Sequence, residues 1–192
     1  MGVEDHRLLL LRHGETEWSE SGQHTGCTEI DLTEAGREQA RASADTLKKL
    51  DLGNPLVISS PRRRAIDTAE LAGLHVDEVT EDLAEWDYGC YEGLTTAQIR
   101  ESAPDWLIWT HGAPDGERVT QVRDRADAAV ALALRNLETR DVVFVGHGHF
   151  SRAVIVRWMK LPVAEGVRVA MPAGGIAVCG FEHGQRQLAR LI

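Results

Sequence analysis

Cysteine is scarce in this sequence, and its spacing excludes two classes of small protein. The cysteines number three, lie far apart and form no Cys-x-x-Cys pair. Such an odd and scattered set argues against a disulfide scaffold and against a zinc ribbon. We therefore expect free thiols and a reducing compartment, which makes a cytoplasmic location the prediction. The cysteines are Cys27, Cys90 and Cys179.

Long hydrophobic runs are missing as well. No apolar run approaches the roughly 20 residues that cross a bilayer. The first eleven residues show no charged start, apolar stretch and small-residue cleavage site of a secretion signal. The sequence therefore predicts no membrane segment and no exported precursor.

Positive charge is in deficit. The formal net charge is −9, and a phosphate backbone needs a basic surface, so nucleic acid is not an expected partner. Lysine is rare too, because only positions 48, 49 and 160 carry it. Three arginines nevertheless stand together at 62–64. A local site for an anion stays open despite the overall sign.

The composition is that of a globular chain. Hydrophobic residues make up 43% of the 192 residues and charged residues 27%, which suits one domain with a substantial core. No repeat, linker or low-complexity segment divides the sequence. Residues 1–192 are predicted to form a single domain.

Short apolar runs alternate with helical periodicity along the chain. Strands that alternate with helices predict an α/β fold with a mostly parallel central sheet covered on both faces. A hairpin is expected to close the chain. We expect strands at 7–11, 55–59, 75–79 and 141–145, helices at 33–50, 61–71, 94–101, 118–137 and after 146, and the hairpin at 175–181 and 186–191.

Three of the buried strands end in groups that can do chemistry. Arg12 and His13 follow the first, residues 59–64 follow the second, and His147 follows the third. Parallel strands have their carboxyl ends on one side of the sheet, so the three sets can converge on one crevice. When residues 8–18 are considered alone, an alternative has equal weight: Arg12 and His13 are solvated at the tip of the strand and form no site.

Phosphate is the ligand that these residue types favour. Guanidinium groups pair bidentately with phosphate oxygens. A histidine that is held at one ring nitrogen can attack phosphorus with the other. Metal binding is the weaker hypothesis, because His147 and His149 lie on a strand-to-helix turn where their rings need not share a direction. We predict no metal and no cofactor.

Four segments of the sequence occur in the order typical of one family. They are RHGETEW at 12–18, RAIDTA at 64–69, LAEWDYGCYEGLT at 83–95 and VGHGHFSRAV at 145–154. Together they resemble the histidine phosphatase superfamily, also called the phosphoglycerate-mutase-like family, over residues 7–182. The resemblance implies a phosphoglycerate-mutase-like three-layer α/β/α sandwich. Within that family, the chain is most similar in character to small acid phosphatases of broad specificity.

The resemblance also implies roles for individual residues. His13 is the expected nucleophile, which becomes a phosphohistidine, and Glu85 is the expected proton donor to the leaving alcohol. Arg12, Arg64 and His147 are expected to hold the phosphoryl oxygens. Ser19 stands where many relatives carry asparagine, which weakens its expected contact. The substrate-binding residues implied are Gly14, Thr16, Ser19, Thr25, Gly26 and Gly148.

Several residues near these motifs have two readings. Arg62 and Arg63 are expected to be solvated at a helix start, with phosphate contact as the alternative. Trp106 and Trp109 either cover an organic substrate or pack in the core. Three further histidines are expected to flank the pocket, namely His24, His111 and His149.

The spacing of the motifs bears on the reaction. Segment 104–117 contains no lysine or arginine, whereas the mutases that the chain resembles carry a basic insert between the corresponding motifs. We therefore expect a phosphomonoesterase for small organic phosphate monoesters, with an acidic optimum if Glu85 must stay protonated. The alternatives are a phosphoglycerate-mutase-type phosphotransferase and a non-catalytic binding protein on the same fold. A homodimer is a weaker prediction, and the sequence does not choose the physiological substrate.

Overall fold

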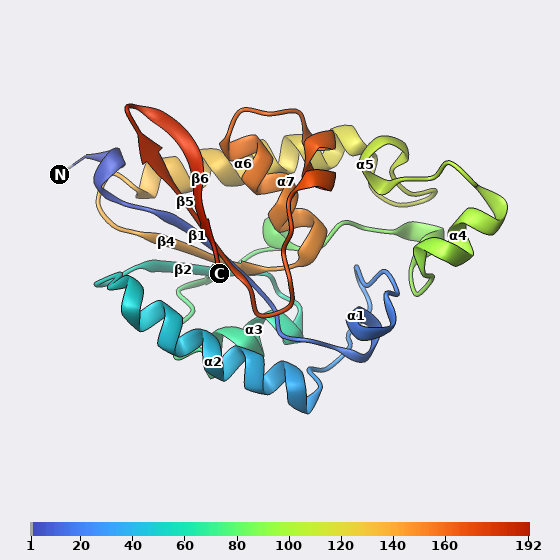
Figure 1. The fold of residues 1–192 in the computed structure, drawn as a ribbon, viewed down its shortest axis with the longest axis horizontal. Coiled ribbons are helices and arrows are strands. Elements are labelled where there is room, and N and C mark those ends of the chain that lie inside the picture. The colour runs from blue at the N-terminus through green and yellow to red at the C-terminus, as the bar shows by residue number, and fades with distance from the viewer. Residues whose placement is uncertain (1) are drawn as a thin grey trace.

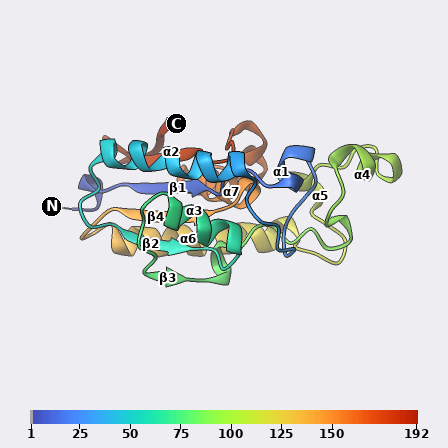
Figure 2. The same cartoon turned by 90° about the horizontal axis from the view of Figure 1, so that it is seen from below.

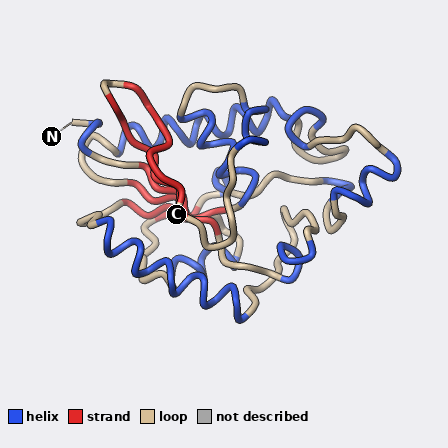
Figure 3. Tube along the Cα trace, viewed as in Figure 1, coloured by secondary structure: helices blue, strands red, loops and turns tan. Residues whose placement is uncertain are grey.

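A mixed β-sheet forms the centre of the computed structural model, which describes residues 2–192 (Figures 1 and 3). Within that range six strands lie in the order β3-β2-β4-β1-β5-β6. The first four strands pair in parallel. Strand β5 pairs antiparallel with β1, and β6 pairs antiparallel with β5. The strands are β1 (Leu8–Arg12), β2 (Leu56–Ser59), β3 (Glu78–Val79), β4 (Val142–Gly146), β5 (Ile176–Glu182) and β6 (Gln185–Leu191).

Helices cover both faces of the sheet, so the predicted three-layer α/β/α sandwich is confirmed (Figures 1 and 2). Helices α2 and α3 lie on one face, and α6 and α7 lie on the other. The α-helices are α1 (Glu17–Ser21), α2 (Glu34–Leu50), α3 (Arg63–Leu71), α4 (Thr96–Ser102), α5 (Ile108–His111), α6 (Val119–Asn136) and α7 (Gly148–Trp158). Short 3₁₀ turns are η1 (Val3–Asp5), η2 (Glu81–Leu83), η3 (Gly89–Tyr91) and η4 (Val163–Arg168).

The leucine run of β1 supplies both cores. Leu8 and Leu10 join the core that contains residues of α6 and α7. Leu9 and Leu11 join the core that contains residues of α2 and α3. Successive side chains of a strand point to opposite faces, so a sheet that is covered on both sides needs a continuous apolar run.

No helix among the described residues is long and apolar enough to cross a bilayer.

Local hydrogen bonds set the boundaries that the sequence placed less well. Helix α3 begins at Arg63 and not at Pro61, because Arg62 is extended and its N–H donates to Ser60 Oγ at 3.3 Å. Strand β3 has two residues and not the five expected at 75–79. The N–H of Val57 donates to the Asp77 carboxylate at 2.8 Å. In a longer parallel strand pair, that N–H would donate to a backbone carbonyl instead.

The carboxyl ends of β1, β2 and β4 meet at one edge of the sheet. Arg12 lies opposite Gly146, and Ser59 lies opposite Val145. Just beyond β1 the chain passes very close to α2. A Cβ on Gly14 would collide with the Gly36 carbonyl, so only glycine fits there. This contact directs the chain after His13 across the end of the sheet.

Candidate active site

A cavity of about 170 Å³ opens at the carboxyl ends of β1 and β4. Its lining comes from residues 12–25, from the segment before η3, and from the start of α7. Among the predicted catalytic residues, Arg12, His13 and Glu85 line this cavity. Among the predicted substrate-binding residues, Ser19, Thr25 and Gly148 do so.

His13 lies at the inner end of the cavity with one ring nitrogen already bonded. Its Nδ1 is 2.7 Å from the carbonyl oxygen of Gly14. A carbonyl only accepts, so Nδ1 carries the proton and Nε2 keeps its lone pair. Burial and the charges of Arg12 and Arg64 hold the pKa of His13 well below 6.5. The ring is therefore neutral, and Nε2 is the ring nitrogen that carries the lone pair.

Arg64 is fully buried in the first turn of α3 and is fixed by backbone carbonyls. Its Nη1 donates to Thr28 O at 2.8 Å, and its Nη2 donates to Thr25 O and Gly26 O, each at 3.1 Å. Its Nε is buried and has no partner within residues 2–192. The guanidinium is held by one edge, and the Nε–H remains free for a ligand.

Arg12 is held in a similar way at the end of β1. Its Nη1 donates to Met171 O at 2.6 Å, and its buried Nε has no partner in the described part of the chain. Burial lowers the pKa of both guanidiniums from its usual value, and the charge of Glu85 opposes that shift. Gly148 lets this guanidinium approach α7, because a Cβ there would stand 3.2 Å from Arg12 Cζ.

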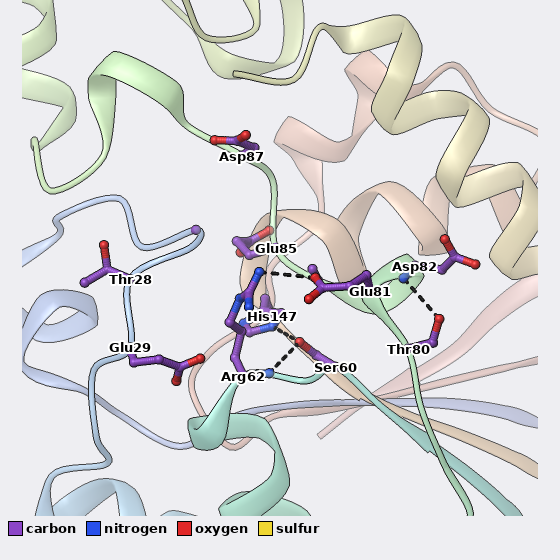
Figure 4. A network of polar contacts seen from close by, with 12 residues as sticks. Thr28, Glu29, Ser60, Arg62, Thr80, Glu81, Asp82, Glu85, Asp87 and His147 are labelled. Carbon is purple, nitrogen blue, oxygen red and sulfur yellow. Dashed lines mark hydrogen bonds and ion pairs between the residues drawn. The ribbon is translucent and has the colours of Figure 1, made fainter. Parts of the chain in front are cut away.

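His147 is the N-cap residue of α7 and is fully buried. Its ring meets that of His13 edge-on, with the centroids 5.2 Å apart. Its Nε2 is 2.7 Å from Ser60 Oγ (Figure 4). Its Nδ1 is buried without a partner among the residues described. Burial, followed by the charge of Arg64, holds the pKa of His147 well below 6.5.

These four side chains form what we call the inner pocket: Arg12, His13, Arg64 and His147. The two guanidiniums lower the pKa of both histidines, so all four groups share one small region. Three of them present a buried nitrogen without a partner in residues 2–192. Leaving a buried donor unpaired costs about 1–3 kcal/mol. An anion with several acceptor oxygens removes that cost, and a phosphoryl group fits this description.

Glu85 lies between the inner pocket and the rest of the cavity, and three backbone N–H groups hold its carboxylate. Oε1 accepts from Trp86 and Phe150, both at 2.8 Å, and Oε2 accepts from His149 at 2.9 Å. The last two donors belong to the first turn of α7, where a negative group is favoured. Oε2 keeps a free lone pair that can carry a proton.

Four further residues that line the cavity form what we call the outer wall: His24, Tyr88, His149 and Arg152. Tyr88 Oη is 2.6 Å from His149 Nδ1, and the His24 ring stacks on Tyr88 with centroids 4.7 Å apart. Burial lowers the pKa of His24 to about 4 and that of His149 well below 6.5. Burial also raises the pKa of Tyr88 well above 10. Three of the four groups are therefore neutral.

Arg152 is the charged member of the outer wall. Its Nε donates to Gly166 O at 2.9 Å, and its guanidinium stands 4.8 Å above the Trp109 ring. Within residues 2–192 it forms no ion pair. Neither Arg152 nor Tyr88 is among the site residues predicted from the sequence. The signal was available, because Tyr88 lies in the LAEWDYG motif and Arg152 follows Gly148 by one helical turn.

Three of the predicted substrate-binding residues do not line the cavity. Gly14 lies against α2, and its N–H donates to Thr68 Oγ1 at 3.0 Å. Thr16 is buried as the N-cap of α1. Gly26 donates its N–H to the Glu92 carboxylate at 2.9 Å and offers its carbonyl to Arg64. The observed contacts of these residues are with the protein.

The residues with two readings separate clearly. The favoured expectation for Arg62 is wrong: its side chain is only 18% exposed, its Nη2 pairs with Glu81 at 3.2 Å, and its buried Nε has no partner among the described residues. Arg63 is 69% exposed, as expected, and pairs with Asp67. Trp106 and Trp109 are buried in the core, at 4% and 2% exposure. His111 is exposed and does not line the cavity.

Metal-binding side chains are not grouped in the described part of the chain, where no three His, Cys, Asp or Glu residues could jointly hold an ion. The charged groups of the site are instead three arginines, Arg12, Arg64 and Arg152, and the Glu85 carboxylate. This combination suits an anionic ligand.

Comparison with known proteins places this geometry in a family. Residues 8–192 match the family model of the histidine phosphatase superfamily (branch 1). An acid phosphatase of Mycobacterium tuberculosis is 68% identical over 191 residues, which cover 100% of this chain and 94% of that protein. A 2,3-bisphosphoglycerate-dependent phosphoglycerate mutase of Corynebacterium diphtheriae is 32% identical over 166 residues, 79% of this chain and 67% of that protein.

Solved structures agree with the sequence comparison. The structure of an open reading frame from Mycobacterium tuberculosis superimposes with a TM-score of 0.96 at 67% identity, covering 97% of each chain. The motif order, the buried histidine pair and the family match lead to the same result. The chain belongs to the histidine phosphatase superfamily, branch 1.

Proposed function

We propose that this protein is an acid phosphatase that hydrolyses small organic phosphate monoesters through a phosphohistidine at His13. One observation carries the proposal: a neutral His13, with its lone pair on Nε2, lies beside three buried nitrogens that lack partners within residues 2–192. Nucleophile and phosphoryl site are thus formed together in the inner pocket.

The first half of the reaction transfers the phosphoryl group to the protein. The phosphoryl oxygens accept hydrogen bonds from Arg12 Nε, Arg64 Nε and His147 Nδ1. His13 Nε2 attacks phosphorus, and the bond between phosphorus and the ester oxygen breaks. Glu85 gives its proton to that oxygen, so an alcohol and not an alkoxide leaves. Positioned donors of this kind supply most of the catalysis in phosphoryl transfer.

The second half returns the protein to its starting state. Water attacks phosphorus, and the Glu85 carboxylate takes a proton from that water. The bond between phosphorus and His13 Nε2 breaks, and inorganic phosphate leaves. The Gly14 carbonyl, which accepts from Nδ1, stabilises the positive charge that the ring carries as a phosphohistidine.

Hydrolysis is better supported than phosphate transfer between positions of a glycerate. The relative named acid phosphatase is 68% identical, against 32% for the relative named mutase. Segment 104–117, which contains no lysine or arginine, contributes no residue to the cavity lining. A cavity of about 170 Å³ favours a small leaving group.

Phosphate release tests the proposal. p-Nitrophenyl phosphate should be hydrolysed between about pH 4 and pH 8, a range that brackets the titration of Glu and His, with chelator present. His13→Ala should abolish turnover, and the control His111→Ala, an exposed histidine outside the cavity, should not. Failure of the wild-type protein to release phosphate would overturn the proposal. Mutase activity primed by a bisphosphate, or binding alone, would then be tested.

The location and the assembly of the protein belong to the same proposal. All three cysteines are free thiols, which supports a reducing compartment such as the cytoplasm. β6 is an edge strand of the sheet, with Leu191 40% exposed, and a homodimer through this edge stays a prediction. Sedimentation of the purified protein measures it.

A further inference from the structure

Ser60 is a buried hydroxyl next to the inner pocket that the mechanism above does not use. It follows β2 directly and is 0% exposed. Its Oγ has two neighbours within hydrogen-bond distance, His147 Nε2 at 2.7 Å and the N–H of Arg62 at 3.3 Å (Figure 4). A serine hydroxyl has one proton to donate and lone pairs to accept with. The question is which way the short bond to His147 runs.

The Arg62 contact decides the direction. A backbone N–H is always a donor, so Ser60 Oγ accepts from it. If His147 Nε2 also donated to Ser60, the hydroxyl proton would need an acceptor, and none is present within residues 2–192. If Ser60 donates to His147 Nε2, the hydroxyl uses both of its contacts, and only the His147 Nδ1–H is left without a partner in the described chain. The first arrangement leaves two atoms unpaired, the Ser60 hydroxyl proton and the His147 Nδ1 lone pair. Buried polar groups are nearly always paired, which favours the second arrangement.

The direction of this bond determines what His147 can do. Burial and four neighbouring ionisable side chains, with Arg64 first among them, hold the pKa of His147 well below 6.5, so the ring is neutral and carries one proton. When Nε2 accepts from Ser60, that proton is on Nδ1. Nδ1 is also the ring atom that is buried without a partner in the described chain. Only this tautomer can donate to a phosphoryl oxygen.

We propose that Ser60 is a positioning residue: its hydroxyl donates to Nε2 of His147 and thereby keeps the proton on Nδ1, where it binds a phosphoryl oxygen. The proposal rests on the proposed phosphatase function for its purpose, though not for its geometry. Under this proposal Arg62 contributes through its backbone, because its N–H donates to the Ser60 hydroxyl and orients it.

The tautomer can be read directly, without any activity. Two-bond ¹H–¹⁵N correlation spectra distinguish a protonated ring nitrogen from one with a lone pair, and His147→Asn assigns the signals. The wild-type protein should show the proton of His147 on Nδ1. A proton on Nε2 in the wild-type protein overturns the proposal, whatever the enzyme does. This measurement separates the proposal from the phosphatase function.

Kinetics then test the consequence with a matched pair of serines. Ser60→Ala should lower kcat/KM for p-nitrophenyl phosphate roughly 10- to 100-fold, the usual loss when a partner that orients a functional histidine is removed. It should also weaken inhibition by inorganic phosphate and shift the His147 signals. Ser60→Thr, which keeps the hydroxyl, should recover most of the activity.

Ser59→Ala is the control, because Ser59 is equally buried but donates to the Ser60 carbonyl, at 2.9 Å, and not to a ring. It should leave the activity and the His147 tautomer unchanged. Thermal melts show that each variant is folded. An active wild type whose Ser60→Ala variant keeps the same tautomer and the same kcat/KM overturns the role of Ser60. An inactive wild type with the Nδ1 tautomer contradicts the proposed function alone.

Discussion

The inner pocket, of which Arg12 and His13 line the cavity while Arg64 and His147 are buried behind them, differs from the outer wall in how its side chains are held. The inner pocket stands on the ends of β1 and β4 and on the first turn of α3, and its side chains are tied by short hydrogen bonds to backbone or hydroxyl oxygens. The outer wall combines ring contacts with hydrogen bonds between side chains, such as that from Tyr88 to His149, and two of its four members come from connecting segments. Under the proposed function, we therefore expect the inner pocket to carry the phosphoryl chemistry and the outer wall to select the leaving group.

The largest expected effect lies at Glu85, which joins the two sides. Glu85→Gln keeps the shape of the side chain but removes the proton donor. We expect kcat for an alkyl phosphate to fall roughly 10²- to 10⁴-fold. p-Nitrophenolate is a good leaving group and needs little protonation, so its kcat should fall much less. Equal losses for the two substrates would contradict the assignment of Glu85 as the acid.

Arg64 tests the inner pocket. Arg64→Met removes three hydrogen bonds to backbone carbonyls together with the free Nε–H, and kcat/KM should fall roughly 10²- to 10³-fold for every substrate. The control is Arg63→Met, since the neighbouring side chain is 69% exposed and pairs only with Asp67. If the two variants behave alike in steady-state assays, the phosphoryl site is not where the inner pocket lies.

Arg152 tests the outer wall. We expect Arg152→Gln to lower kcat/KM for 3-phosphoglycerate relative to glycerol 3-phosphate roughly 10-fold, because only the first carries a carboxylate that a guanidinium can bind. Arg186→Gln is matched to it, since that guanidinium stands 5.5 Å over the Trp158 ring outside the cavity lining. If the ratio of the two kcat/KM values is unchanged in the Arg152 variant, Arg152 does not bind the carboxylate of the substrate.

The smallest expected effect is on stability in mild acid. The pKa of His24 is about 4 in the folded protein and near 6.5 when unfolded. Below pH 6.5 the unfolded chain therefore binds the extra proton, and stability falls as the pH falls toward 4. From pH 6.5 to about pH 5.5 this one group should remove about 1 kcal/mol from the free energy of unfolding.

Chemical denaturation at the two pH values measures this loss. His24→Phe keeps a ring against Tyr88 but cannot take up a proton, so its loss between the two pH values should be smaller by about 1 kcal/mol. Identical losses in the variant and the wild-type protein would show that His24 is not held neutral by burial.

The same contrast explains what the sequence could predict. Three residues of the inner pocket, Arg12, His13 and His147, could be predicted because they lie at the ends of apolar strands, as Arg12 follows Leu8–Leu11. Arg64 was selected from its neighbours by the register of the RAIDTA motif in the family resemblance. The α/β class and the parallel part of the sheet follow from the same runs. The family match then confirmed the motifs that carry the resemblance.

In the outer wall, His24 and His149 were predicted to flank the pocket and do line the cavity. Tyr88, Arg152 and the supporting residues were not predicted, because their positions depend on contacts between distant segments. Gly26 bonds to the Glu92 carboxylate 66 residues away, and the backbone it anchors in turn holds Arg64. The side chain of Arg62 folds back to Glu81, a pairing that helical periodicity cannot reveal. Sequence motifs name residues near the site, and tertiary contacts decide which of them face the cavity.

The most direct test of the central claim is to trap the phosphorylated protein. A single turnover with a slowly hydrolysed monoester, quenched in alkali where phosphohistidine survives, should yield one phosphorylated peptide. Tandem mass spectrometry should locate the group on His13, and ³¹P spectra should place it on Nε2. A phosphoryl group on His147 or His149, or turnover that never phosphorylates the protein, would contradict the account.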